Sequence, residues 1–135
     1  MSYRRLPLAA ATVLLATVSV FAQGRRGPDW VLLGERTVTD RADHDVVPVT
    51  AERGTFRAIR LDVMLHAVDF HRVVIHFGNG DDQKVELRAT IKAGGSSRVI
   101  DIDGADRVIK SIEFWYDAAT IGRGGKAVVR TMGRH

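Results

Sequence analysis

The sequence predicts an all-β protein, an antiparallel β-sandwich of about eight strands with a jelly-roll-like arrangement. From Trp30 onward, short runs rich in Val, Ile, Phe and Thr alternate with clusters of Gly, Asp and Asn. Turn residues recur about every 8–12 positions, a spacing typical of two-sheet sandwiches. No stretch of this region keeps an apolar stripe at helical spacing over three turns, which argues against amphipathic helices.

Eight runs are predicted strands, each bounded by turn residues. In chain order they are residues 30–38, 45–49, 56–65, 68–77, 85–91, 98–102, 108–116 and 127–131. Gly34 marks an expected bulge in the first run, and Pro48 places the second at a sheet edge because proline has no N–H to donate. Residues 78–82 form a turn, since Asn and Gly tolerate positive φ. Glycines at 94–95 and 122–125 separate the later runs.

Alternation within the runs predicts which side chains are buried. In the third run, one face carries Ile59, Leu61, Val63 and Leu65. In the fourth, the buried face carries Val73, Ile75 and Phe77. In the seventh, Ile112, Phe114 and Tyr116 share one face, and Glu113 and Trp115 share the other. One buried and one solvated face is what antiparallel sheets permit. Trp30, at the start of the first run, is expected to fill the core.

The first 22 residues are typical of a secretory signal peptide. Arg4 and Arg5 precede an uncharged apolar run over residues 6–21, and Ala22 suits cleavage by a signal peptidase. The run is at the lower length limit for a membrane span and contains Pro7. We therefore expect cleavage, no stable membrane insertion afterwards, and a protein that is exported, either periplasmic or secreted.

Cleavage would leave residues 23–29 as a flexible linker and residues 30–135 as one β-sandwich domain. The chain contains no cysteine, which excludes disulfides and thiolate chemistry, and no motif for a cofactor, so none is expected. Of 20 basic residues, two leave with the signal peptide, and 18 then face 16 acidic ones. An excess of two charges is too small to predict a nucleic-acid partner.

Several segments resemble a family of small exported bacterial proteins known only as a domain of unknown function. The likeness is carried by Leu33-Gly34, 56–61 (Phe-Arg-Ala-Ile-Arg-Leu), 74–80 (Val-Ile-His-Phe-Gly-Asn-Gly), Ala93-Gly94, 98–109 and Ile112-Glu113-Phe114. It covers residues 30–116 and implies a periplasmic or secreted β-sandwich. The resemblance brings no catalytic residues. Some members carry cysteines, so the absence of cysteine here argues against a redox role.

Two groups of polar residues have the composition of metal ligands. Asp101, Asp103 and Asp106 alternate around a glycine and are candidate calcium ligands. The closing glutamate of a calcium loop is missing, and a turn between two strands explains the same residues. The other group, the histidines at 66, 71 and 76, suggests zinc, but His71 and His76 fall on opposite faces of a regular strand. Only a bulge near Arg72 would bring them together.

Trp115 is the candidate ligand-binding residue. On the face opposite Phe114 and Tyr116, an exposed indole would stack on a sugar ring or on a partner's apolar surface. The alternative is a central strand that is buried on both faces, in which case Trp115 belongs to a core.

The sequence favours an exported, non-catalytic binding or accessory module of the bacterial cell envelope, with an envelope protein or a glycan as its partner. No nucleophile elbow or other catalytic motif is present, so an enzyme is not expected. Two alternatives remain: a hydrolase that acts on envelope carbohydrate through scattered carboxylates, and a purely structural, stress-protective protein.

Overall fold

The computed structural model describes residues 29–135. The predicted signal peptide and the linker up to residue 28 lie outside the described residues. The described part contains the strands β1 Val31–Thr39, β2 His44–Pro48, β3 Thr55–Phe56, β4 Ala58–Met64, β5 Val68–Phe77, β6 Asp82–Ile91, β7 Ile100–Asp101, β8 Arg107–Tyr116 and β9 Lys126–Arg134. Two short 3-10 helices, η1 Ala51–Arg53 and η2 Ala118–Ile121, connect strands. The predicted all-β class is confirmed, with nine strands in place of about eight.

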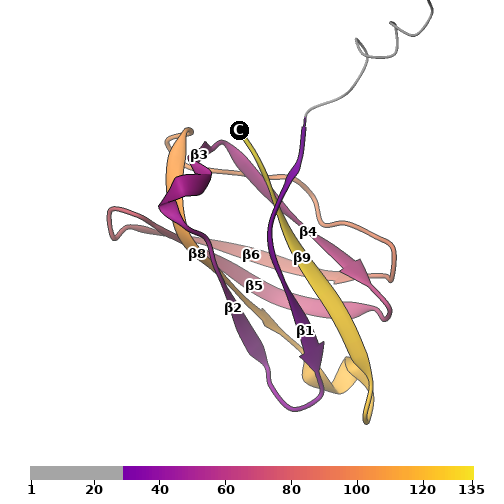
Figure 1. Cartoon of the computed structure of the whole chain (residues 1–135). Coiled ribbons are helices and arrows are strands. Elements are labelled where there is room, and N and C mark those ends of the chain that lie inside the picture. The colour runs from indigo at the N-terminus through magenta and orange to yellow at the C-terminus, as the bar shows by residue number, and fades with distance from the viewer. Residues whose placement is uncertain (1–28) are drawn as a thin grey trace, which may run out of the picture.

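The strands form two antiparallel sheets that pack face to face (Figure 1). One sheet has the order β1-β9-β4-β7, and the other has the order β2-β8-β5-β6, with β3 also paired to β8. The chain passes from sheet to sheet at most connections, and the two strand orders are those of a jelly roll. Strand β2 lies at an edge, as Pro48 predicted.

The core lies between the sheets and is built from the inward faces that alternation predicted. The five-stranded sheet contributes Phe70, Val73, Ile75, Phe77, Ile112, Phe114 and Tyr116, and the four-stranded sheet contributes Ile59, Leu61, Val63 and Val129. In β8, the intervening residues Glu113 and Trp115 are only partly buried and lie on the outer face. The register shift of β1 between Leu32 and Gly34 confirms the expected bulge.

The predicted strand over residues 56–65 was wrong in two respects. It is divided at Arg57, because Phe56 pairs with β8 in one sheet and Ala58 pairs with β9 in the other. It also ends at Met64, and Leu65 adopts a positive φ of 76° and is 71% exposed. A residue in the left-handed region cannot continue the pleat, so Leu65 leaves the core face that its spacing predicted.

The expected core position of Trp30 was also wrong. Trp30 is partly buried, and its ring lies 4.5 Å from the guanidinium carbon of Arg60 and 5.2 Å from that of Arg134. Both arginines lie on the outer face of the four-stranded sheet. The indole therefore covers that outer face and takes no part in the core.

A bulge in β5 sets which residues of that strand face solvent. The pairing of β5 with β8 shifts between Phe70 and Arg72, so that His71 is inserted without a partner of its own. Beyond the bulge, Arg72, Val74 and His76 lie on the outer face and alternate with core residues. These three side chains therefore share the outer face of the five-stranded sheet.

Candidate functional site

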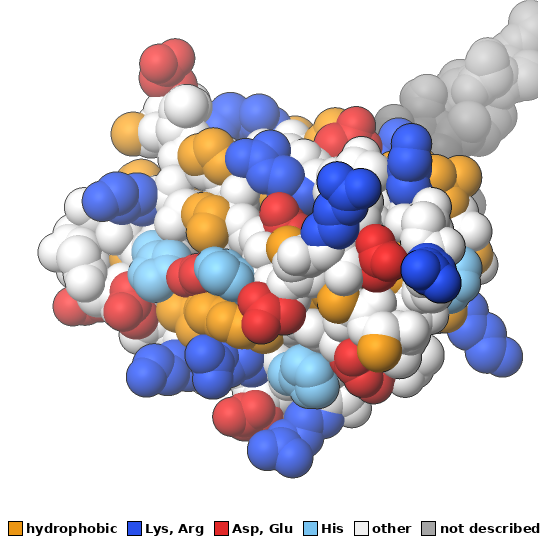
Figure 2. Space-filling model, turned by 90° about the horizontal axis from the view of Figure 1, so that it is seen from below, with side chains coloured by type: hydrophobic (Ala, Val, Ile, Leu, Met, Phe, Trp, Pro, Cys, Tyr) orange, Lys and Arg blue, Asp and Glu red, His pale blue; other side chains and the backbone are white. Residues whose placement is uncertain are grey.

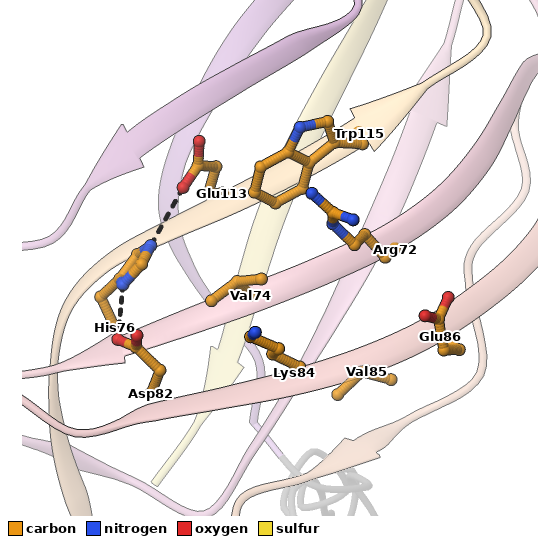
Figure 3. A pocket seen from close by; sticks show the side chains of 9 residues that line it. All are labelled: Arg72, Val74, His76, Asp82, Lys84, Val85, Glu86, Glu113 and Trp115. Atoms are coloured by element: carbon orange, nitrogen blue, oxygen red, sulfur yellow. Dashed lines mark hydrogen bonds and ion pairs between the residues drawn. The ribbon is translucent and has the colours of Figure 1, made fainter.

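A pocket of about 410 Å³ lies on the outer face of the five-stranded sheet. It is lined by Arg72, Val74 and His76 of β5, by Asp82, Lys84, Val85 and Glu86 of β6, and by Glu113 and Trp115 of β8 (Figure 3). We call it the outer-face pocket. All nine lining residues belong to three paired strands of this sheet, so the sheet sets the shape of the pocket.

His76 is held between two carboxylates in the outer-face pocket. Its Nδ1 lies 2.6 Å from Oδ1 of Asp82, and its Nε2 lies 3.0 Å from Oε1 of Glu113 (Figure 3). Strand pairing accounts for the contacts, because Asp82 stands directly opposite His76 in β6, and Glu113 belongs to the strand on the other side. An imidazole with a carboxylate at each nitrogen is best satisfied as imidazolium, which donates from both.

The hydrogen bond to Glu113 is the largest cause that raises the pKa of His76 above its ordinary value of 6.5. Burial opposes this effect, and the hydrogen bond and the charge of Asp82 add to it. The structure thus favours the protonated form of His76 at a pH where a free histidine has begun to lose its proton.

Stability should therefore depend on pH through His76. A raised folded pKa means that the two ion pairs stabilise the fold fully below about pH 6.5 and are lost as the pH rises through that folded pKa. We expect wild type to lose more free energy of unfolding than His76→Gln between about pH 6 and about pH 9. Urea unfolding of both proteins at the two pH values measures the difference, and equal losses would contradict the prediction.

Trp115 lies on the outer face and is half-buried, an outcome between the two that the sequence left open. His44 of β2 stacks on it, with ring centroids 5.6 Å apart and planes 14° from parallel. The guanidinium carbon of Arg72, on β5, lies 4.1 Å from the centroid of the indole. Because β2 and β5 flank β8 on opposite sides, the two side chains cover opposite faces of the ring. A ligand in the outer-face pocket therefore meets the indole edge together with Arg72, and not a bare stacking surface.

Glu113, two residues before Trp115 on the same face of β8, connects His44 with His76. Its Oε2 lies 3.6 Å from Nε2 of His44, while Oε1 is bound to His76. Figure 2 shows histidines next to acidic side chains, beside a patch of hydrophobic atoms on this surface. Alternation placed Glu113 and Trp115 on one face. The partners His44, Arg72 and His76 were missed, because contacts between strands depend on a register that the sequence does not reveal.

The candidate calcium ligands are not brought together. Among residues 29–135, no group of three or more His, Cys, Asp or Glu side chains is placed to hold a metal ion. Asp106 is bound to Arg57, with Nε 3.1 Å from Oδ1. The backbone of Asp101 and Asp103 is instead tied to Gln83: the amide of Gln83 donates to the carbonyl of Asp101, and its Oε1 accepts from the N–H of Asp103. The alternative interpretation, a turn between strands, describes this loop.

The histidines considered for zinc also remain apart. The bulge that would have been needed near Arg72 does occur, but His71 is exposed and His76 is bound to two carboxylates. His66 belongs to the connection between β4 and β5, where its Nδ1 contacts the carbonyl of Ala67 at 2.8 Å.

Helices long and apolar enough to cross a membrane are absent from the described part of the chain. No curated protein matches this sequence. Among solved structures, this chain is similar to one titled "Structural and functional characterization of Pseudomonas aeruginosa AlgX", with 20% sequence identity and a TM-score of 0.49. The match covers 84% of this chain and 27% of that chain.

The family described as Domain of unknown function (DUF2541) matches residues 8–133, which is nearly the whole sequence. The suspected membership in a family of unknown function is confirmed: the chain belongs to the DUF2541 family.

Proposed function

We propose that this protein is an exported, non-catalytic binding module of the bacterial cell envelope, and that it binds through the outer-face pocket. One observation carries the proposal: Trp115 is fixed in the pocket wall between Arg72 and His44, next to hydrogen-bonding groups. Aromatic side chains that are rigidly held beside polar groups supply much of the affinity in binding sites. Export is supported by the order of charged, apolar and small residues in positions 1–22.

The competing function is a hydrolase, and the carboxylates of the pocket are the observation that favours it. Glycoside hydrolysis needs one protonated carboxylic acid and a second carboxylate across the scissile bond. Here Asp82 and Glu113 both accept hydrogen bonds from one imidazole, His76. Because both carboxylates are already engaged by one side chain of the sheet, binding is the function that this geometry favours.

The experiment is a crosslinked pull-down from the bacterium's own envelope fraction, analysed for glycans and proteins. Trp115→Ala should weaken binding of the recovered ligand at least about tenfold, since truncating a central aromatic commonly costs about 2 kcal/mol or more. Loss of a half-buried ring and its cation–π contact should cost stability only about 1–2 kcal/mol.

The other tryptophan of the chain provides a matched control. Trp30 is also partly buried and also lies against arginines, but on the opposite sheet. Trp30→Ala should leave binding unchanged. Equal loss in both variants, or in neither, would overturn the proposed site. Recovery of the native protein from the cytoplasm alone would overturn export, and new reducing ends on a bound glycan would indicate a hydrolase.

A further inference from the structure

The basic and acidic side chains of the outer-face pocket differ in how they are engaged. Each carboxylate has a cationic or imidazole partner: Asp82 and Glu113 bind His76, and Glu86 lies 3.6 Å from Arg88. Within residues 29–135, by contrast, neither Arg72 nor Lys84 forms an ion pair or a side-chain hydrogen bond. The two charges that remain available to a ligand are therefore both positive.

Arg72 is also held in a conformation suited to binding an anion. Its guanidinium carbon lies 4.1 Å from the centroid of the Trp115 indole, a cation–π contact that restricts the side chain and leaves its N–H donors unused within residues 29–135. A planar fork of N–H donors matches the two oxygens of a carboxylate or a phosphate. Because the contact with Trp115 already restricts the side chain, less conformational entropy is lost on binding.

Lys84 supplies a second positive charge from the neighbouring strand. It stands opposite Val74 in the pairing of β5 with β6, and Arg72 is two residues from Val74 on the same face. Figure 3 shows both basic side chains on the walls of the pocket, with Val74 between the strands that carry Trp115 and Lys84. Glu86 stands directly opposite Arg72, but its carboxylate lies 3.6 Å from Arg88, and an anion between Arg72 and Lys84 would be approached from two strands of the sheet.

We propose that the outer-face pocket binds a glycan unit that carries a carboxylate or a phosphate, and that Arg72 and Lys84 hold this anion. The inference rests on the proposed binding function and names its ligand class. The pocket volume of about 410 Å³ lies in the range of small-ligand sites. A pocket of this size accommodates a sugar unit better than it accommodates the flat surface of a partner protein. At the end of the pocket where His76 lies, Asp82 and Glu113 each have further acceptor capacity and would accept hydrogen bonds from hydroxyl groups of the ligand.

The test measures binding by isothermal titration calorimetry to trigalacturonate and to its uncharged methyl ester, and to galactose 6-phosphate and to galactose. Wild type should bind at least one charged probe more tightly than its uncharged counterpart. Arg72→Gln and Lys84→Gln should each weaken that charged probe about tenfold, and Arg72→Lys should weaken it less because the charge remains. Lys126→Gln, which removes an exposed charge from the other sheet, should have no effect.

The outcomes distinguish a carboxylate from a phosphate, and they distinguish failure of the anion proposal from failure of the proposed binding function. Preference for trigalacturonate indicates a carboxylate, and preference for the sugar phosphate indicates a phosphate. Charged and uncharged probes that bind equally well, or not at all, would overturn the anion proposal, as would an Arg72→Gln variant with wild-type affinity. If Trp115→Ala still weakened an uncharged ligand in that case, the binding function would stand and only its ligand class would fall.

Discussion

Phe114→Ala is expected to lower the free energy of unfolding by about 3–5 kcal/mol, the largest loss predicted for this protein. Phe114 is fully buried near the C-terminal end of β8 and packs edge-on against Phe70, with ring centroids 5.8 Å apart. It also contacts Tyr116 at 6.0 Å. Truncation would leave a cavity between the sheets that regular strands cannot collapse to fill.

Denaturant unfolding of this variant is best compared with that of Trp115→Ala. The two residues are neighbours in sequence, are both aromatic and point to opposite faces of one strand. If Trp115→Ala cost as much stability as Phe114→Ala, the outer face would be a second core and the binding role of Trp115 would lose its basis.

Gly34→Ala should lower the free energy of unfolding by about 1–3 kcal/mol although it adds only one methyl group. That methyl would lie 2.5 Å from Cγ1 of Val47. Gly34 belongs to the four-stranded sheet and Val47 to the five-stranded sheet, so the glycine allows the sheets to approach closely at this edge. Val47 is 1% exposed and has little room to move away.

A double-mutant cycle provides the control for this prediction. Val47→Ala removes the atom that the new methyl would strike, so the double variant should be more stable than the sum of the two single losses predicts. Strictly additive losses, measured by thermal and urea unfolding, would show that the clash is relieved elsewhere and that Gly34 is needed for another reason.

Side-chain periodicity predicted the parts of the fold that depend on local sequence. Strict alternation in β8 assigned Phe114 to the core and Trp115 to the outer face, because successive side chains in a strand point to opposite sides. The positions of Gly34 at a bulge and Pro48 on an edge strand followed from the conformational limits of those two residues. Each of these inferences uses information within a few residues of the chain.

Features that depend on pairing could not be predicted. Nothing in the apolar spacing of residues 56–65 shows that Phe56 pairs with β8 and Ala58 with β9, which is why one predicted strand became two. The same limit applied to the site. His76 and Glu113 are 37 residues apart, and they meet only because β5 and β8 are neighbours in the sheet. A sequence can show that a histidine is polar and outward, but not which carboxylate it meets.

The position of β9 has a consequence for the order in which the protein folds. Strands β1 and β4 do not pair with each other, and β9 lies between them. The four-stranded sheet therefore cannot form until β9, residues 126–134, has been synthesised. Long-range pairing of this kind makes folding slow. The core between the two sheets therefore closes only after β9 has inserted between β1 and β4.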